Sequence, residues 1–540
     1  MNTPILTLKN LKIHPKNSSS PLVDDIGFEL NRGEILALVG ESGSGKSITA
    51  LAIMRLLPDA LHIVGGQVML GSDALFEMTE SEMNRVRGRR IAMIFQEPQS
   101  ALNPVQTVGE QLLEVLTLHR NLLAEDTQAD VLKLLDEVGI PDPQLRLNWY
   151  PHQLSGGQIQ RVMIAMALAC DPDVLIADEP TTALDVTIQK QVLELLQGLR
   201  VQRDLAILFI THDMAVVNQI ADRVAVMCRG KIVETSRCDR FFRAPKHPYS
   251  QGLINALPNT DTYLRIEPDR KVLRVDNLRV WFPQRTGFMQ KVTGYTKAVD
   301  GVSFHIGEGE TLALVGESGC GKTTTGRAIL RLCPRTRGQI SFGNHVIHDL
   351  TDSAYRPYRR KIQIIFQDPY SSMNPRMTIG EIIDEGMRAL TRDIPAKIRN
   401  DHIRNLMHRV GLRDEHLLRY PHEFSGGQRQ RISIARALAV KPSLIICDEP
   451  TSALDVSLRS DVLHLLRELQ EQDGIAYLFI THDLTLIPSF AHRVAVMKEG
   501  KIVEQGYAEE IMLRAEHPYS RELIAAAPKA PILLASASHD

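Results

Sequence analysis

An internal repeat constrains this chain more than any other feature, because each half carries the same short motifs in the same order. The segment GESGSGKS at residues 40–47 returns as GESGCGKT at residues 316–323. The later motifs return about 270 residues on, and chance similarity of short strings does not produce so steady a spacing. The matched positions are Gln96 and Gln367, Ser155 and Ser425, Asp178 and Asp448, His212 and His482, and the HPYS segments that begin at residues 247 and 517. The chain therefore contains two copies of one domain.

The repeat predicts a first domain at residues 1–258, a linker at 259–271 and a second domain at 272–540. The linker sequence, NTDTYLRIEPDRK, is polar and suits an exposed connection. Within each copy, apolar runs of strand length alternate with longer amphipathic segments, as in DVLIADEP followed by IQKQVLELLQGLRVQ. This alternation predicts an α/β fold, with a mostly parallel sheet covered by helices.

The composition limits which partners and which cellular location we expect for the chain. The 62 basic and 64 acidic residues give a net charge of -2, so no basic field extends over the whole surface, and we expect no nucleic-acid partner. No apolar run approaches the roughly 18 residues that a bilayer crossing needs, and the start MNTPILTLKN does not resemble a signal peptide. We therefore expect a cytoplasmic protein that can lie on a membrane. The six cysteines form no C-x-x-C pair, so we expect neither metal ligation nor disulfides.

The first repeated motif predicts a phosphate-binding loop. In EILALVGESGSGKSITALAIMRLL, a buried strand leads into a glycine-rich turn and then into a helix. The glycines allow consecutive backbone N–H groups to converge on an anion, and the helix start adds its positive dipole end. Lys46 then offers a charge to the terminal phosphates. The predicted phosphate-binding residues are Gly40, Glu41, Ser42, Gly43, Ser44, Gly45, Lys46 and Ser47, and Gly316, Glu317, Ser318, Gly319, Cys320, Gly321, Lys322 and Thr323.

Two acids follow a buried strand in each copy. In DVLIADEP and LIICDEP, Asp178 and Asp448 can hold a metal ion, together with the hydroxyls of Ser47 and Thr323. The acids that come next, Glu179 and Glu449, can act as bases toward an attacking water.

A histidine ends a further apolar strand in each copy. His212 and His482 both lie in the sequence FITHD, which predicts them at the same sheet edge as the acids. We expect each of them to contact the terminal phosphate.

A second glycine-containing helix start accompanies each phosphate loop. Its N–H groups and hydroxyl predict a second anion site, although helix capping alone would explain the serine. The predicted residues are Ser155, Gly156, Gly157 and Gln158, and Ser425, Gly426, Gly427 and Gln428.

Taken together, these motifs resemble those of the ATP-binding cassette (ABC) ATPases, over about residues 5 to 528. In that family the phosphate loops are Walker A motifs, Gln96 and Gln367 form the Q-loops and join the metal site, LSGGQ and FSGGQ are signatures, and His212 and His482 are switch histidines. The resemblance implies an ATPase that uses ATP and Mg²⁺, and a fold that adds an antiparallel β subdomain and a helical signature subdomain to each parallel sheet. It also implies that each signature closes on the nucleotide held by the other copy, so that the glycine-started helices recur because each seals its partner's ATP.

The resemblance extends to the adenine site. Phe282, with Trp281 beside it, matches the aromatic residue that stacks on adenine. The matching position of the first copy holds Pro15, next to His14, so the stacking partner in that copy stays open.

Within the family, MIFQEPQSALNP, YPHQLSGG and the HPYS segments resemble the ATPases of peptide and nickel importers. The fused arrangement and FPQRTGFMQK most resemble the Yej-type peptide importer, whose relatives also admit microcin C. The resemblance implies two inner-membrane permease subunits as partners, with a periplasmic peptide-binding protein acting indirectly. It places the chain at the cytoplasmic face of the inner membrane, with its coupling surface after Gln96 and Gln367.

Some importers of this group carry a four-cysteine iron-sulfur motif, and none is expected here, because no cysteine follows Cys447. The alternative function is that of a soluble twin-cassette ATPase acting on ribosomes. Those proteins have a long, charged helical linker, which residues 259–271 do not match.

Overall fold

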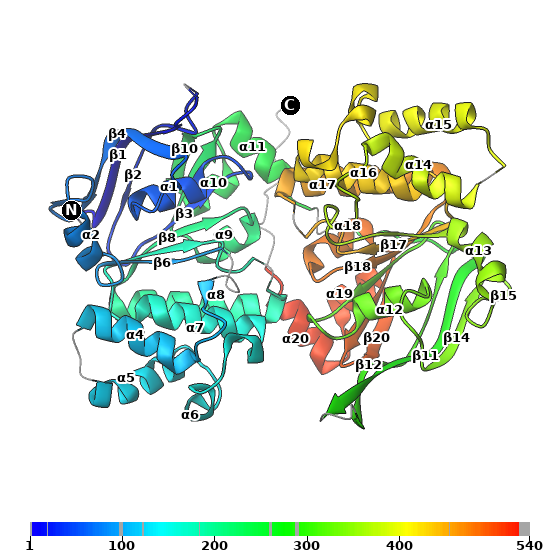
Figure 1. The fold of residues 1–540 in the computed structure, drawn as a ribbon, viewed down its shortest axis with the longest axis horizontal. Coiled ribbons are helices and arrows are strands. Elements are labelled where there is room, and N and C mark those ends of the chain that lie inside the picture. The colour runs from blue at the N-terminus through cyan, green and yellow to red at the C-terminus, as the bar shows by residue number, and fades with distance from the viewer. Residues whose placement is uncertain are drawn as a thin grey trace, which may run out of the picture. The chain divides into compact units, whose positions relative to one another are not determined.

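The computed structural model describes residues 3–18, 20–96, 101–120, 124–182, 184–258, 262–286, 291–391, 393–452 and 454–528. Residues 97–100, directly after Gln96, and residues 259–261 of the predicted linker lie outside this part of the chain. The chain forms two compact units that divide between Leu257 and Pro258. Both units have the same architecture, which Figure 1 shows as a ribbon.

The core of the first unit is a six-stranded sheet in which every neighbouring pair is parallel except at one edge. Its inner strands are fully buried and continuously apolar, as strands covered by helices on both faces must be. In order across the sheet, the strands are β10 (Lys231–Arg237), β9 (Arg223–Cys228), β3 (Ile35–Val39), β8 (Ala206–Thr211), β7 (Val174–Asp178) and β6 (Ile91–Ile94).

A four-stranded antiparallel sheet accompanies this core, and its burial alternates along β1, as expected for a sheet with one apolar face. Its strands are β2 (Val23–Leu30), β1 (Leu6–Pro15), β4 (Leu61–Leu70) and β5 (Asp73–Ala74).

The helices of the first unit fall into two groups, of which α4, α5 and α7 pack together in a separate helical part. The helices are α1 (Lys46–Ile53), α2 (Glu80–Val86), α4 (Val108–Arg120), α5 (Ala124–Glu137), α6 (Pro143–Arg146), α7 (Gly156–Leu168), α8 (Val186–Arg203), α9 (Met214–Ile220), α10 (Cys238–Arg243) and α11 (Pro248–Asn255).

The second unit repeats both sheets. The large sheet has the order β16 (Ile362–Ile365), β17 (Leu444–Asp448), β18 (Ala476–Ile480), β13 (Thr311–Val315), β19 (Arg493–Lys498) and β20 (Lys501–Tyr507). The antiparallel sheet has the order β12 (Lys291–Gly307), β11 (Lys271–Thr286), β14 (Arg337–Phe342) and β15 (His345–Val346). The predicted combination of a mostly parallel sheet, an antiparallel sheet and a helical part is thus confirmed in both units.

The helices of the second unit follow those of the first in order. They are α12 (Lys322–Ile329), α13 (Asp352–Lys361), α14 (Ile379–Leu390), α15 (Ala396–Arg409), α16 (Gly426–Leu438), α17 (Val456–Asp473), α18 (Ile487–Phe490), α19 (Ala508–Arg514) and α20 (Pro518–Ala526). No helix in the described ranges has both the length and the apolar character that a bilayer crossing requires.

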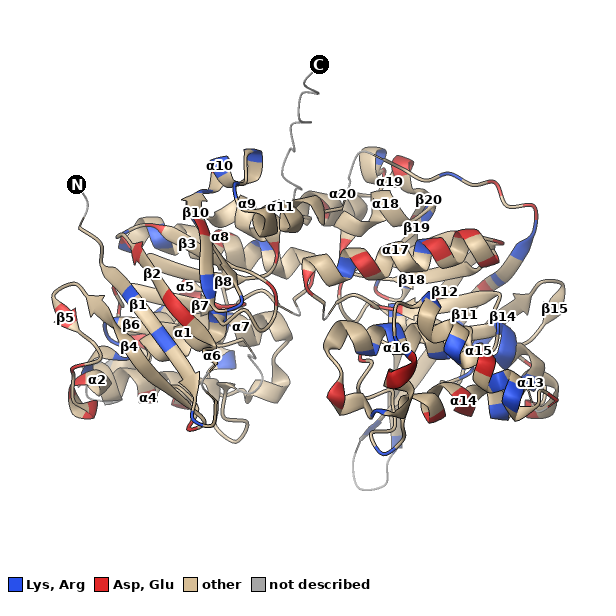
Figure 2. Cartoon of the chain, turned by 90° about the horizontal axis from the view of Figure 1, so that it is seen from above, with Lys and Arg blue, Asp and Glu red and all other residues tan. Residues whose placement is uncertain are grey.

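Charged residues of both signs are mixed along the ribbon of each unit, and the clearest basic group lies on α13 (Figure 2). This helix has Asp352 in its first turn and Arg359, Arg360 and Lys361 in its last. Acids near the start and bases near the end of a helix oppose its macrodipole and stabilise it. The basic group therefore has a local structural explanation.

Residues 262–270 form neither helix nor strand, and they pack on the second unit. Arg265 forms an ion pair with Glu509 at 3.0 Å, and its guanidinium lies 5.2 Å from the centre of the Tyr507 ring.

We predict that Phe209→Ala lowers the free energy of unfolding of the first unit by about 3 to 5 kcal/mol, because it leaves a cavity in a packed core. Phe209 is fully buried on β8, among the side chains that join the sheet to the helical part. Urea unfolding followed by circular dichroism measures the change. Val201→Ala is the control, because Val201 is 75% exposed; equal shifts in the two variants would contradict the packing described here.

Candidate nucleotide site

Each phosphate loop leaves the carboxyl end of a central strand and enters a helix. The first loop runs from β3 to α1, and the second runs from β13 to α12. The glycines that cap the helices, Gly45 and Gly321, have φ angles of 105° and 107°. A Cβ at Gly321 would lie 2.1 Å from the carbonyl oxygen of Ala298, so both the space and the backbone conformation require glycine there.

The loop lysines are buried, and they donate hydrogen bonds to the loop backbone. Lys46 Nζ lies 2.7 Å from the carbonyl oxygen of Gly40 and 2.9 Å from that of Glu41. Lys322 makes the same two bonds to Gly316 and Glu317, at 2.7 and 2.8 Å. Each ammonium group therefore lies inside the curve of its own loop, where a bound phosphate would meet it.

The predicted metal ligands come together in pairs. Ser47 Oγ donates to Asp178 Oδ1 at 3.0 Å, and Thr323 Oγ1 donates to Asp448 Oδ1 at 2.8 Å. Burial raises the pKa of Asp178 to about 6 and also raises the pKa of Asp448, although the hydroxyl bonds act in the opposite direction. Hydroxyl and carboxylate oxygens are the donors that Mg²⁺ prefers, so the residues present fit this ion.

The glutamate after each of these aspartates is hydrogen-bonded to a histidine and a glutamine, whereas the aspartate is bonded to a hydroxyl of the phosphate loop. Glu179 and Glu449 both have a φ of 48°, which is rare for a residue with a side chain. His212 Nδ1 lies 3.0 Å from Glu179 Oε1, and the Gln96 amide donates to Glu179 Oε2 at 2.9 Å. Strained backbone of this kind is frequent at functional sites, where it aims a side chain.

The second copy repeats this arrangement closely. His482 Nδ1 lies 3.1 Å from Glu449 Oε1, and Gln367 donates to Glu449 Oε2 at 2.9 Å. Burial is the largest single effect on both glutamates and acts to raise their pKa, but the bond to histidine, the charge of that histidine and the charge of the loop lysine together outweigh it, so the pKa of each is lowered. Burial acts to lower the pKa of His482, but the bond and charge of Glu449 and the charge of Asp483 together outweigh it, so the pKa is raised.

Both Q-loop glutamines, which the family resemblance assigns to the metal site, donate here to the glutamates. Thr182 donates to Glu179 Oε2 at 2.9 Å and was not anticipated. Because Thr182 stands three residues after the glutamate in a turn, that spacing is the only signal the sequence offers for it.

The serines of the second glycine motif cap their helices. Ser155 Oγ accepts from the N–H of Gln158 at 3.3 Å, and the Gln158 side chain accepts from the N–H of Ser155 at 3.1 Å. Ser425 and Gln428 form the same capping box on α16. Capping therefore accounts for the serine and the glutamine, and the two glycines between them need a separate explanation.

The glycines that start these two helices differ in their surroundings. A Cβ at Gly157 would lie 2.6 Å from Ile188, so packing excludes a side chain there. At Gly156 and Gly426, a Cβ would meet no atom of the described chain within 4 Å. Two other helical glycines, Gly198 and Gly252, are equally open. Their counterparts in the second copy are Glu468 and Glu522, whereas Gly156 and Gly426 match each other.

Phe282 lies on β11, opposite Thr296 of β12, and is 40% exposed. In the first unit the corresponding end of β1 holds His14 and Pro15, and the His14 ring lies 6.3 Å from that of His62. A stacking role for Phe282 stays a prediction.

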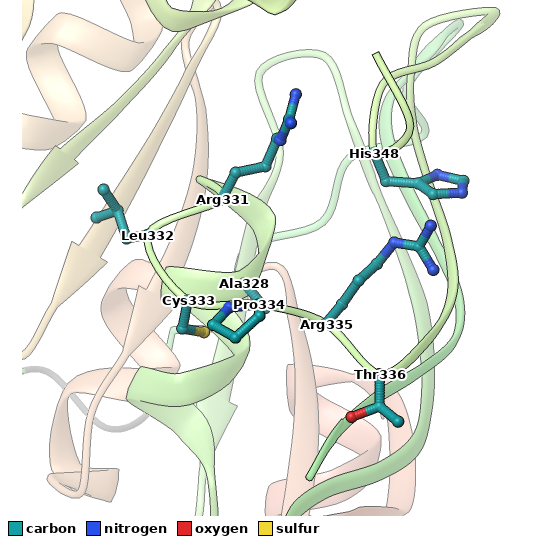
Figure 3. Close-up of a pocket in the computed structure, with 8 residues that line it drawn as sticks. All are labelled: Ala328, Arg331, Leu332, Cys333, Pro334, Arg335, Thr336 and His348. Carbon is teal, nitrogen blue, oxygen red and sulfur yellow. The ribbon is translucent and has the colours of Figure 1, made fainter. Parts of the chain in front are cut away.

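A pocket of about 570 Å³ in the second unit lies beyond the end of α12 (Figure 3). Its basic side chains already have protein partners. Arg335 and His348 both contact Asp349, with His348 Nε2 2.9 Å from Oδ2, and Arg331 donates to the carbonyl oxygen of Leu350 at 2.8 Å. Because the phosphate loop leads into the other end of α12, this pocket is separate from the nucleotide site.

Comparison with known proteins identifies the chain. The family described as "ABC transporter" matches residues 23–182 and 299–452, and the one described as "Oligopeptide/dipeptide transporter, C-terminal region" matches residues 233–275. The chain is 48% identical to the glutathione import ATP-binding protein GsiA of Escherichia coli (strain K12), over 97% of this chain and 90% of that protein. It is also 48% identical to the protein of the same name from Salmonella typhimurium (strain LT2), over 96% of this chain and 89% of that protein. Over 44% of its length, it is similar to the solved dimer of the ATP-binding cassette MJ0796 bound to ADP and Pi, with 28% identity, a TM-score of 0.40 and 98% of that chain covered.

The chain therefore belongs to the ABC transporter family, as a twin-cassette ATPase of the oligopeptide/dipeptide importer group.

Proposed function

We propose that this protein hydrolyses ATP to drive the import of short peptides through two permease subunits of the inner membrane. A periplasmic peptide-binding protein would deliver the substrate, and this chain would lie at the cytoplasmic face as a peripheral subunit. One observation carries the proposal: a complete set of phosphate loop, acid pair, glutamine and histidine is present in both copies. The division into residues 1–258, 259–271 and 272–540 is part of the same proposal.

The proposed roles follow from the contacts of each side chain. Lys46 and Lys322 would transfer their hydrogen bonds from the loop carbonyls to the terminal phosphates. Mg²⁺, when bound by Ser47 and Asp178 or by Thr323 and Asp448, would supply charge neutralisation to the phosphates.

Glu179 and Glu449 are the proposed bases for the attacking water. Their lowered pKa keeps them ionised at neutral pH, and an ionised carboxylate can accept a proton. His212 and His482 orient these carboxylates through their Nδ1 bonds. Gln96 and Gln367 bond to the same carboxylates, and they would join the metal site once they release them.

We further propose that each ATP is closed by the signature of the other copy. The open space at Gly156 and Gly426 supports this, because neither packing within the described residues nor a positive φ calls for glycine at these positions. A ligand that approaches the helix start closely would exclude a side chain at both positions. One site would join Lys46, Asp178, Glu179 and His212 to Ser425–Gln428, and the other would join Lys322, Asp448, Glu449 and His482 to Ser155–Gln158.

The proposal that peptides are the substrate rests on the similar proteins and on the family match at residues 233–275. Relatives that are 48% identical are named for glutathione import, so we propose glutathione, a tripeptide, as the first substrate to test. A longer peptide, as in the Yej-type importers, is the second. The match at residues 233–275 to the oligopeptide/dipeptide group favours transport over the alternative of an ATPase that acts on ribosomes.

We predict that Glu179→Gln and Glu449→Gln each bind ATP and lower its turnover, and that the double variant loses about a hundredfold or more, because the water loses its base. Phosphate release with purified protein measures turnover. Glu194→Gln is the matched control, because Glu194 is exposed on α8 and pairs only weakly with Lys190. Near-normal hydrolysis in the double variant would show that these acids are not the bases.

The composite arrangement predicts a specific count of trapped nucleotide. In the Glu179→Gln, Glu449→Gln background, adding Lys46→Ala and Gly426→Glu should leave about one ATP per chain, because both changes affect the same site. Adding Lys46→Ala and Gly156→Glu should leave none. Filter binding of labelled ATP counts the nucleotide, and Gly198→Glu replaces the second change in the control. Equal counts for Gly426→Glu and Gly156→Glu would contradict closure across the two copies.

We predict that the protein sediments with inner membranes only when its permease subunits are co-expressed, because the partner supplies the binding surface. Immunoblots of membrane, ribosomal and soluble fractions make the measurement. Recovery in ribosomal pellets, with none gained in membranes on co-expression, would support the alternative function.

A further inference from the structure

The HPYS segments begin the C-terminal helix of each unit, and their histidine and proline form the start of that helix. His247 Nδ1 accepts from the N–H of Tyr249 at 3.2 Å, and His517 accepts from Tyr519 at 3.2 Å. Pro248 and Pro518 are the first residues of α11 and α20, a position that proline suits. These local bonds leave the tyrosine side chain without an explanation.

The tyrosine hydroxyl reaches the phosphate loop in both units. The N–H of Glu41 donates to the Tyr249 hydroxyl oxygen at 3.1 Å, and the N–H of Glu317 donates to that of Tyr519 at 3.2 Å. The partners are separated by 208 and 202 residues in the chain. Because the two copies make this long-range contact at matched positions, it is a feature of the domain and not an accident of one loop.

One loop residue in each unit, Glu41 or Glu317, is hydrogen-bonded both to the tyrosine and to the loop lysine. Glu41 donates its N–H to Tyr249 and accepts from Lys46 Nζ at its carbonyl oxygen. Glu317 is held in the same way by Tyr519 and Lys322. When the lysine turns to a phosphate, it gives up this carbonyl, and the tyrosine bond still fixes the amide at the beginning of the loop.

A carboxylate, buried in the first unit and half-buried in the second, fixes the segment that carries the tyrosine. Glu234 on β10 accepts from the N–H groups of Lys246 and His247, at 3.0 and 2.9 Å. Glu504 on β20 accepts from Glu516 and His517, at 2.7 and 3.2 Å. A carboxylate that receives two backbone N–H groups holds them firmly, since such charge-assisted bonds are about twice as strong as neutral ones.

The strand next to β10 also approaches the loop closely. The strand that pairs with β10 is β9, and a Cβ at Gly40 would lie 2.1 Å from the carbonyl oxygen of Met227 on β9. In the second unit, the Lys498 ammonium lies 4.6 Å from the centre of the Tyr519 ring, a cation–π contact. The start of each loop thus contacts both the tyrosine and the strand beside the edge of the sheet.

We propose that Tyr249 and Tyr519 are positioning residues, whose hydroxyl oxygens hold the base of each phosphate loop in the shape that receives the phosphates of ATP or ADP. A loop held in its bound shape loses less conformational entropy on binding, so the contact acts on nucleotide affinity. It acts equally on the bound substrate and the transition state, and it therefore changes KM and leaves kcat alone. The proposal depends on the assignment of residues 40–47 and 316–323 as nucleotide loops.

The test is Tyr249→Phe combined with Tyr519→Phe in the full-length chain, which removes the hydroxyls and keeps the rings. We expect the Kd for MgADP, measured by titration calorimetry, to rise about threefold to tenfold, the effect of one ordinary hydrogen bond. KM for ATP should rise in parallel, and kcat should stay within about twofold of its starting value. The control is Tyr358→Phe, because the ring of Tyr358 packs edge-on against Phe342 in the second unit and lies outside the loop.

A Kd within about twofold of that of the unchanged protein, or a fall in kcat at constant KM, would overturn the proposal. A loss of melting temperature with no change in Kd would also overturn it, because it would show a purely structural contact. Should the double variant not fold, Glu234→Gln and Glu504→Gln make the same test without altering the tyrosine. If the unchanged protein itself failed to bind MgADP, the assignment of the nucleotide loops would fail instead.

Discussion

The close approach of a glycine to a backbone carbonyl, at the end of the central strand, is the contact on which each nucleotide site depends. A Cβ at Gly40 would lie 2.1 Å from the oxygen of Met227, and one at Gly316 would lie 2.2 Å from that of Met497. The loop can leave the strand only because no side chain is present there. Its N–H groups, its lysine and the following helix then take their places around the position of the phosphates. Because β3 and β13 each lie between two parallel neighbours, these loops and the acids that end β7 and β17 meet at one edge of the sheet.

At this edge of the sheet, the pKa values of two adjacent acids are shifted in opposite directions. Burial raises the pKa of Asp178 to about 6, whereas the bonds of Glu179 to His212 and Thr182 shift its pKa downward in spite of burial. Neighbouring titratable groups whose pKa values are moved apart commonly divide the work of a site. An aspartate with a raised pKa gains most from a bound cation, and a glutamate that stays ionised can accept a proton. Glu179 also differs from Asp178 in its left-handed backbone, with a φ of 48°.

The sequence predicts those parts of this site whose residues are close together in the chain. The continuous apolar runs predict the buried strands, and the loop from Gly40 to Ser47 and the acid pair follow from short patterns with known spacing. The contacts from distant segments could not be predicted in this way. Gln96 and Glu179 are 83 residues apart, and Glu41 and Tyr249 are 208 apart. No periodicity links such pairs. Parallel strands bring Gln96 and Glu179 together at their ends, and helix α11 brings Tyr249 to the phosphate loop. The repeat of HPYS indicates that the tyrosine matters, but it cannot say what the hydroxyl touches.

The duplication supplies a comparison within one chain, and it separates the contacts that both copies keep from those that only one has. The pocket of Figure 3 is lined by His348 and Arg335. The first copy has Phe76 and Asp59 at the corresponding positions. The pocket lining is therefore not shared by the two copies, and the nucleotide sites do not depend on it. Likewise, Ser44 stands where the second loop has Cys320, and Cys228 stands where the second unit has Lys498 above its tyrosine. The tyrosine bond to the loop is made in both copies although the residues around it have changed. A contact that survives such changes is held by a requirement that both copies share, and the requirement that they visibly share at this position is the shape of the phosphate loop.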